Sequence, residues 1–214
     1  MATYSITDID LWERFYRANF INSLTGFKSV NLIGTVNKAG QPNLSIFSSI
    51  VHIGSNPPLI GYINRPVKAA PHTMANIEAT GVYTINHIHP SFVQEAHQTS
   101  AKYDLGISEF EEVGLTAAYR KNIVAPFVKE STVQYALSLQ EIIPIQLNDT
   151  FLVIGKVIYI QVDKEIVSED GFLHLDKANS VCSNGVDGYY TTELIERYQY
   201  AKPGTQPQKL NQHG

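Results

Sequence analysis

The feature that most constrains the fold is a pair of long runs rich in β-branched and aromatic residues, Thr132 to Ile143 and Phe151 to Val162. The segment Leu147-Asn148-Asp149-Thr150 lies just before the second run and has the polar residues typical of a tight connection. The pattern predicts a long antiparallel hairpin. It argues against the regular strand–helix alternation that a parallel α/β sheet requires.

Shorter runs of the same kind precede this hairpin, separated by turn residues or by short helical segments. The expected strands are Val30–Val36, Asn43–Ile53, Leu59–Ile63 and Val82–Ile88, and the expected helices are His72–Thr80, which Gly81 ends, and Ser91–Ala101. About six strands joined in this way close most easily into a small antiparallel barrel, because closure removes exposed edges. The sequence therefore predicts a mainly β fold: a β-barrel with peripheral helices.

The chain has 214 residues, a length that favours a single domain over residues 1–214. A helical N-terminal segment is expected over residues 8–26, where apolar residues recur at helical spacing between Ile9 and Leu24 and either Thr7 or Asp8 begins the helix. The region from 103 to 128 is expected to be irregular, and residues 203–214 are expected to form a loose tail.

Charge and composition exclude several classes of function. Sixteen Lys and Arg residues stand against twenty Asp and Glu, and a net charge of −4 argues against a nucleic-acid partner, which needs a basic face. One cysteine, Cys182, allows neither an internal disulfide nor a Cys-rich zinc site. No apolar stretch is long enough to span a membrane, and the start of the chain does not resemble a signal peptide. We expect a cytoplasmic protein with no membrane partner.

The usual catalytic signatures are absent: the sequence has no GxGxxG, Walker A, GxSxG or HExxH motif. No catalytic residue is therefore assigned. His87 and His89 would lie on the same side of a strand, which could begin a metal site with His97 or His72. The other reading is a pair of polar histidines at a strand end, and no metal is expected.

Two regions indicate a bound polar ligand. Ser48 and Ser49 interrupt the hydrophobic run from 43 to 53, so at least one hydroxyl needs a buried partner, either neighbouring backbone or a ligand. Arg65 comes shortly before the helix that His72 and Thr73 begin. A helix N-terminus and a nearby guanidinium together favour a phosphate. Both regions together suggest a ligand with a phosphate at one end and a flat polar body at the other.

The order of these pieces resembles the flavin reductase-like family of FMN-binding split barrels, which includes flavoredoxins. The family has a Gly-Pro-Asn turn, a hydroxyl-rich strand, a Pro-Pro break, a "His-Thr … Asn-Ile" helix, a "Thr-Gly-x-Phe/Tyr-x-x-Asn" strand and a lysine-bearing loop. The resemblance covers most of the chain between Phe27 and Val162. Its segments here are Asn31–Thr35, Gly40–Asn43, Ser48–Ile50, Asn56–Pro58, His72–Ile77, Thr80–Asn86, Lys102-Tyr103, Glu109-Phe110 and Gly114–Thr116.

The resemblance implies an antiparallel split β-barrel that forms a homodimer, binds FMN and takes a hydride from NADH or NADPH for a small-molecule electron acceptor. The implied contacts to the isoalloxazine or ribityl chain are Ser29, Asn31, Ser48 and Ser49. The implied phosphate contacts are Arg65, His72 and Thr73, with Lys102 reaching the flavin or the phosphate from its loop.

Two other functions remain open from the sequence. A pyridoxamine-phosphate-type flavin oxidase uses a related barrel and would need a second basic pocket for its substrate phosphate. A non-catalytic FMN-binding electron carrier would be reduced by a protein partner and would not oxidise NADH or NADPH.

Overall fold

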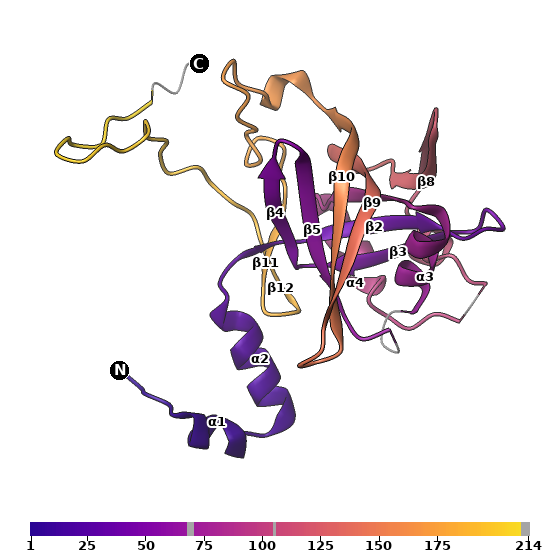
Figure 1. Cartoon of the computed structure of the whole chain (residues 1–214), viewed down its shortest axis with the longest axis horizontal. Helices are drawn as coiled ribbons and strands as arrows, with labels where there is room; N and C mark the ends of the chain where they lie inside the picture. Colours follow the sequence, from indigo (N-terminus) through magenta and orange to yellow (C-terminus); the bar gives the residue numbers. More distant parts are fainter. Residues whose placement is uncertain (68–70, 105, 211–214) are drawn as a thin grey trace.

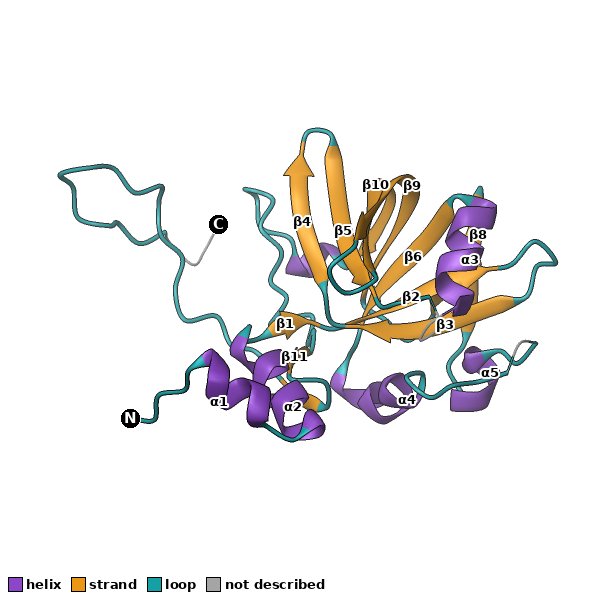
Figure 2. Ribbon diagram, turned by 60° about the horizontal axis from the view of Figure 1, so that its bottom comes forward, coloured by secondary structure: helices purple, strands orange, loops and turns teal. Residues whose placement is uncertain are grey.

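The computed structural model describes residues 1–67, 71–104 and 106–210. Its largest sheet has seven antiparallel strands in the order β3-β2-β6-β9-β10-β5-β4, and the sheet curls around a central core (Figures 1 and 2). The strands are β2 Asn31–Val36, β3 Pro42–Phe47, β4 Ile50–Ser55, β5 Pro58–Asn64, β6 Val82–His87, β9 Val133–Ile145 and β10 Thr150–Val162. The predicted mainly β, antiparallel fold class is confirmed.

The hairpin β9–β10, which the sequence predicts, is the longest pairing in the sheet. Phe151 lies opposite Pro144 and Val162 lies opposite Val133, so the two strands stay paired along almost their whole length. Asp149 adopts a left-handed conformation at the connection, with φ of 57°. Asn and Asp tolerate this conformation better than most residues, which explains the polar turn.

All seven strands contribute to the core inside the curled sheet. The helix α3 (Pro71–Thr80) closes this core with Met74 and Ile77, and Gly81 follows it at φ of 70°. The core side chains are Ile33, Phe47, Ile50, Ile60, Tyr62, Met74, Ile77, Tyr83, Ile85, Tyr135, Leu137, Leu139, Ile142, Phe151, Val153 and Val157. The helix that the sequence predicts at 72–80 therefore forms, one residue longer at its start.

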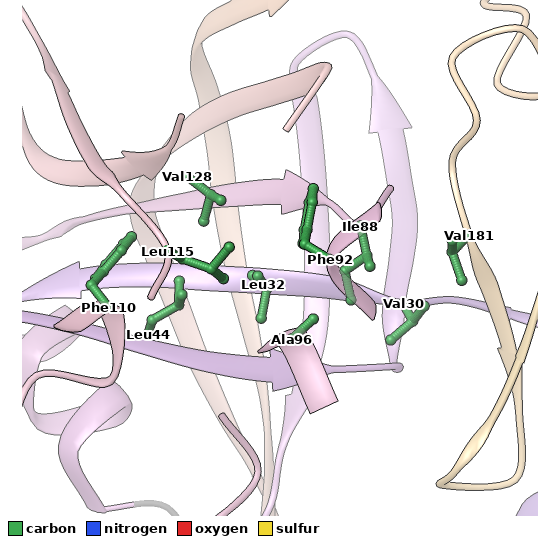
Figure 3. Packing of buried hydrophobic residues seen from close by; sticks show 10 residues of the cluster. All are labelled: Val30, Leu32, Leu44, Ile88, Phe92, Ala96, Phe110, Leu115, Val128 and Val181. Atoms are coloured by element: carbon green, nitrogen blue, oxygen red, sulfur yellow. The ribbon is translucent and has the colours of Figure 1, made fainter. Parts of the chain in front are cut away.

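A second core covers the outer face of β2 and β3 (Figure 3). It packs these strands against the 3₁₀ turn Pro90–Phe92, α4 (Val93–Gln98), α5 (Glu109–Val113) and β8 (Ile123–Val128). Every residue of β2 is buried because both of its faces are covered. Gly34, in the middle of β2, leaves room for the Pro126 carbonyl and for Thr84 Oγ1, which would lie 2.6 Å from an added Cβ. This second core fixes α4 and α5 beside the sheet, where they form one wall of the site described below.

The region expected to be irregular contains more order than the sequence suggests. Besides α5, it holds the two-stranded sheet β7 (Ala117–Arg120) and β8 (Ile123–Val128). Pro126 lies within β8 although it cannot donate a ladder hydrogen bond. It is tolerated here because β8 has a single partner strand, and its carbonyl accepts a hydrogen bond from Thr84 Oγ1 at 2.6 Å.

The N-terminal segment is two helices, α1 (Ile6–Leu11) and α2 (Arg14–Leu24), where the sequence predicts a single one. Ser5, and neither Thr7 nor Asp8, is the N-cap of α1, and it shares a capping box with Asp8. The chain is extended at Trp12, and Glu13 caps α2. Both helices lie beside the barrel and bury no side chain in it (Figure 1); an aromatic cluster joins them, made of Tyr4, Trp12, Tyr16 and Phe20.

A separate three-stranded sheet brings distant parts of the chain together. It consists of β1 (Lys28–Ser29), β11 (Cys182–Asn184) and β12 (Gly188–Tyr190), in the order β1-β11-β12. A 3₁₀ turn at Lys164–Ile166 follows β10. The tail, expected to be loose, forms no named helix or strand over residues 203–210, but it folds back so that Lys209 bridges Tyr198 and Leu210 N–H donates to the Arg197 carbonyl. Its last four residues lie outside the described part of the chain. Among the described helices, none has the length and apolar character needed to cross a bilayer.

Candidate functional site

The two adjacent serines lie at a corner between strands and not inside one strand as predicted. β3 ends at Phe47 and β4 begins at Ile50, so Ser48 and Ser49 form the connection between the two opposite edges of the seven-stranded sheet. Strict alternation of faces applies within a strand and is lost at such a corner. As a result, both serines line the same cavity.

This cavity has a volume of about 720 Å³ and lies where the barrel meets its peripheral elements. The end of β3, the serine corner and the end of β5 form one side, and the first turn of α3 lies at one end. The segment from α4 to Tyr103 and the small sheet β1-β11-β12 complete the enclosure. In Figure 2, α3 and the small sheet lie at opposite ends of the molecule's face, with β3 and the start of β4 between them.

The α3 end of the cavity is suited to an anion. Pro71 is the first residue of the helix, where its missing N–H costs nothing, and His72 and Thr73 follow in the first turn. Thr73 is buried, and Asn43 Nδ2 donates to its hydroxyl at 3.5 Å. Arg65 follows directly after β5 and is exposed, so its guanidinium is free to turn towards a ligand. Backbone donors of the first turn and a nearby arginine are the two features that bind phosphate.

Glu109 is the buried carboxyl group of this end. Its Oε2 accepts a hydrogen bond from the Leu44 backbone N–H at 3.0 Å. Burial raises the pKa of Glu109 above its ordinary value, while the Leu44 hydrogen bond and the nearby His72 act in the opposite direction. The carboxylate is thus engaged in holding α5 against β3.

The serine corner divides its two hydroxyls between structure and the cavity. Ser49 Oγ donates to the Ile63 carbonyl at 3.0 Å and accepts from the Ile63 N–H at 3.3 Å. This hydroxyl therefore extends the contact between the corner and β5. Of the two partners expected for a buried serine hydroxyl, neighbouring backbone or a ligand, Ser49 has the backbone. Ser48 lies beside it, half-buried in the cavity wall.

Six of the eight residues predicted to contact the cofactor line this one cavity: Ser48, Ser49, Arg65, His72, Thr73 and Lys102. The serine corner and the start of α3 beside Arg65 therefore face the same space. From the sequence alone, a shared ligand was the only reason to expect them together. This convergence is the central geometric finding of the site.

The other two predicted residues lie outside the cavity lining. Ser29 is exposed on β1, and its neighbour Lys28 faces the cavity instead. Asn31 is 1 % exposed at the start of β2, opposite Phe47, and its amide has no hydrogen-bond partner among the described residues. The roles that the resemblance implies for these two residues stay predictions.

Five polar residues line the other end of the cavity and were not predicted to do so, although the sequence suggested His97 as a possible metal ligand. These are Lys28, His97, Ser183, Asp187 and Tyr189. They come from β1, α4 and the hairpin β11–β12, and no local motif marks any of them. Alternation along β1 places Lys28 and Ser29 on opposite faces, so the expectation that Ser29 contacts the flavin pointed away from Lys28.

The histidine pair considered for metal binding is engaged otherwise. His87 Nδ1 lies 3.0 Å from Ser180 Oγ, and His89 Nδ1 lies 2.8 Å from Ser91 Oγ. Within the described ranges, no cluster of three or more His, Cys, Asp or Glu side chains could hold a metal ion.

Comparison with known proteins identifies the family. The flavin reductase like domain family matches residues 25–180. A proposed flavin reductase with a split barrel domain from Shewanella frigidimarina is 47% identical, covers 94% of this chain and 100% of its own, and superposes with a TM-score of 0.91. The fold is therefore a split barrel of the flavin reductase type.

More distant solved structures share the fold. Flavoredoxin of Desulfovibrio vulgaris is 23% identical, with a TM-score of 0.69 over 84% of this chain and 92% of its own. The 2-nitrobenzoate 2-nitroreductase of Pseudomonas fluorescens is 18% identical, with a TM-score of 0.78 over 97% of this chain and 99% of its own. On the family match and the Shewanella likeness, this chain belongs to the flavin reductase like domain family.

Proposed function

We propose that this protein binds FMN in the 720 Å³ cavity and transfers a hydride from NADH or NADPH to the flavin. The observation that carries the proposal is that Arg65 and the first turn of α3 line the same cavity as the Ser48-Ser49 corner. Membership of the flavin reductase like domain family supports flavin binding and an oxidoreductase activity.

The residues present fit a flavin mononucleotide. The cavity lies within the range of about 300–1,000 Å³ that small-molecule and cofactor sites occupy. Arg65, His72 and the backbone donors at the start of α3 would hold the phosphate, because the helix dipole and the guanidinium favour negative charge there. Ser48 and the backbone of the corner would face the flat ring, and Lys102 borders the cavity from the loop after α4.

When bound, FMN would supply a ring that accepts a hydride. The chain's part is placement: hydride transfer needs reacting atoms held about 3–3.5 Å apart more than it needs an acid or a base. The buried carboxyl group of the cavity, Glu109, accepts a hydrogen bond from the Leu44 N–H. It therefore has a structural role and is not needed as an acid or a base for hydride transfer. The walls from α4 and β12 would exclude water from one side of the ligand.

The names of two structural neighbours, flavoredoxin and 2-nitrobenzoate 2-nitroreductase, refer to electron transfer and to reduction of a small aromatic molecule. They support a redox role for this fold. We propose a small-molecule electron acceptor for this chain.

The first experiment is a titration of the purified full-length protein with FMN, followed by the visible flavin spectrum. We expect one FMN per chain. Arg65→Ala should weaken FMN binding about 10- to 100-fold, because a charge-assisted hydrogen bond to the phosphate is lost. The matched control is Arg14→Ala in α2, outside the cavity lining, which should leave the affinity unchanged. Failure of the wild-type protein to bind FMN would contradict the proposal.

The second step adds NADH or NADPH to the FMN-loaded protein without oxygen. Bleaching of the flavin absorption by either nucleotide supports hydride transfer. An FMN-loaded protein that neither nucleotide bleaches would instead be an electron carrier reduced by a partner, and the enzymatic part of the proposal would be wrong.

We also propose that the protein acts as a homodimer. The support is a set of exposed apolar side chains on two strands: Val51 and Ile53 on β4, and Ile158 and Ile160 on β10. β4 is an edge strand, and a free edge with apolar neighbours is typical of a surface that pairs with another chain. Location in the cytoplasm stays a prediction.

A further inference from the structure

The end of the cavity opposite α3 contains a row of polar side chains that the proposed flavin contacts do not use. In the small sheet, Lys28 lies opposite Ser183, and Ser183 lies opposite Tyr189. Residues directly opposite each other in a sheet share a face, and all three line the cavity. The register of the sheet therefore places an ammonium, a hydroxyl and a phenol side by side on one wall.

Within this row, Ser183 gives the strongest evidence for a bound ligand. It is 2 % exposed, and its Oγ has no hydrogen-bond partner within the described part of the chain. A buried hydroxyl without a partner is costly, so such a group in a cavity wall is expected to meet a polar atom of a ligand.

The neighbours of Ser183 are held in position by their own contacts. Lys28 Nζ donates to the Asn22 carbonyl near the end of α2 at 2.9 Å, which uses one of its three donors. Tyr189 Oη lies 2.7 Å from His97 Nδ1, so a side chain of α4 holds the phenol in position. Burial, with a smaller effect from Asp187, raises the pKa of Tyr189, so the phenol keeps its proton. In the His97 tautomer that carries the proton on Nδ1, the imidazole donates to Tyr189 Oη and the phenol can donate its own proton to a ligand.

The charges around the cavity favour an anion although the whole chain is acidic. Lys28, Arg65 and Lys102 line it against the two acidic residues Glu109 and Asp187, while the complete sequence has sixteen basic and twenty acidic residues. Asp187, exposed between β11 and β12, is the opposing charge nearest the row. An anion bound there would be attracted by the Lys28 ammonium and repelled by the Asp187 carboxylate.

Most of this wall is not part of the region that defines the family. The family match ends at residue 180, whereas Ser183, Asp187 and Tyr189 belong to the hairpin that follows. A cofactor common to the family is expected to be held by the common region. The hairpin is therefore expected to contact the molecule that differs from one relative to another, which is the substrate and not the shared cofactor.

We propose that the row Lys28–Ser183–Tyr189, supported by His97, is an anion subsite. It binds a carboxylate or phosphate group of the small molecule that exchanges electrons with the flavin. The role of the bound molecule rests on the proposed function, but the binding of an anion at this wall does not.

The test uses the full-length protein and two probes, benzoate and inorganic phosphate, with binding measured by isothermal titration calorimetry. We expect the wild-type protein to bind at least one probe. Ser183→Ala should weaken that binding about 3- to 10-fold and Lys28→Met about 10-fold or more, because each removes a donor. Asp187→Asn should strengthen it a few-fold, because a like charge is removed. Lys156→Met, exposed on β10 and outside the cavity lining, is the matched control.

The probes and variants separate this proposal from the previous one. Preference for benzoate identifies a carboxylate, and preference for phosphate identifies a phosphate. Phosphate bound at α3 instead would respond to Arg65→Ala and not to Ser183→Ala, which would overturn the subsite. FMN affinity should stay within about twofold in Ser183→Ala and Asp187→Asn. A loss of FMN binding in Ser183→Ala as large as in Arg65→Ala would assign the row to the flavin and overturn the proposal.

Two further outcomes would also overturn the subsite: no binding of either probe by the wild-type protein, or equal binding by the wild type and Ser183→Ala. Lack of FMN uptake with intact, row-dependent anion binding would contradict the proposed function and leave the subsite standing. Thermal unfolding of each variant checks that it is folded. If Lys28→Met is unfolded, Ser183→Ala and Asp187→Asn still decide the question, since their predicted effects have opposite signs.

Discussion

At the scale of single residues, burial sets the chemistry of His87. The side chain lies at the end of β6, with its ring edge-on to Tyr135 and its Nδ1 at 3.0 Å from Ser180 Oγ. Desolvation lowers the pKa of His87 to about 4 from its ordinary value of 6.5. The neutral imidazole is therefore the form that the folded protein favours.

This shift predicts how stability depends on pH. Between pH 6.5 and about 4 the unfolded chain binds a proton at His87 that the folded chain does not, so the free energy of unfolding falls as the pH falls through this window. The slope contributed by one such group reaches about 1.4 kcal/mol per pH unit.

The measurement is urea unfolding at several pH values for the wild type and for His87→Phe. The variant should lose this part of the slope, while the carboxyl groups that titrate in the same window contribute equally to both proteins. Parallel pH curves for the two proteins would show that His87 is not the group responsible.

At the scale of elements, α5 protects one edge of the main sheet. β3 is the edge strand beside β2, and its Leu44 N–H points away from β2 towards Glu109 Oε2. Glu109 is the first residue of α5 and is 4 % exposed. One buried carboxyl group thus satisfies a strand donor and attaches the helix to the sheet, which is one way natural proteins cover an edge.

We predict that Glu109→Ala destabilises the protein by about 1–3 kcal/mol, because it leaves the buried Leu44 N–H without an acceptor. Glu109→Gln is the matched control: its amide oxygen can accept the same hydrogen bond, so most of the stability should remain. Both are compared with the wild type by chemical denaturation without flavin. Equal losses in the two variants would show that the hydrogen bond itself contributes little.

The elements also show what a sequence of this kind can predict. β9–β10 and α3 were predictable because long β-branched runs, a polar turn and Gly81 act locally. The corner at Ser48-Ser49 was not, because it contains no glycine or proline and the hydrophobic run continues on both sides.

The same reasoning explains the site. Five of the six predicted residues that line the cavity lie at the serine corner, just after β5 or at the start of α3, where local patterns mark them, and Lys102 was implied by the resemblance alone. Ser183 belongs to the three-residue strand β11, whose partner β1 is far away in the chain, and Tyr189 belongs to β12, which pairs with β11. Nothing local in the sequence reveals such a pairing, so the wall they form requires the structure.

At the scale of the whole molecule, the two edges of the seven-stranded sheet differ. β3 is covered by α5, whereas β4, at the opposite edge, has Val51 and Ile53 exposed. β10 exposes Ile158 and Ile160 in the part of the strand that extends beyond its pairing with β5. Apolar side chains beside an unprotected edge are the expected place for a second copy of the chain.

The predicted homodimer should have twice the mass of the 23.8 kDa chain in light scattering after size-exclusion chromatography. Ile160→Arg should shift the protein towards the monomer, because an arginine in the apolar surface would be buried without a partner. Leu147→Arg, in the exposed connection of the β9–β10 hairpin, is the control and should leave the mass unchanged. A monomeric wild type would contradict the prediction.

The hairpin β11–β12 has one further consequence. It belongs to its own small sheet and shares no strand with the barrel, yet four of its residues face the cavity: Ser183, Val186, Asp187 and Tyr189. Exchanging this short ribbon between relatives would alter one wall while leaving the seven-stranded scaffold and the start of α3 untouched. The architecture therefore gives evolution, or an engineer, a graftable module for changing which molecules enter.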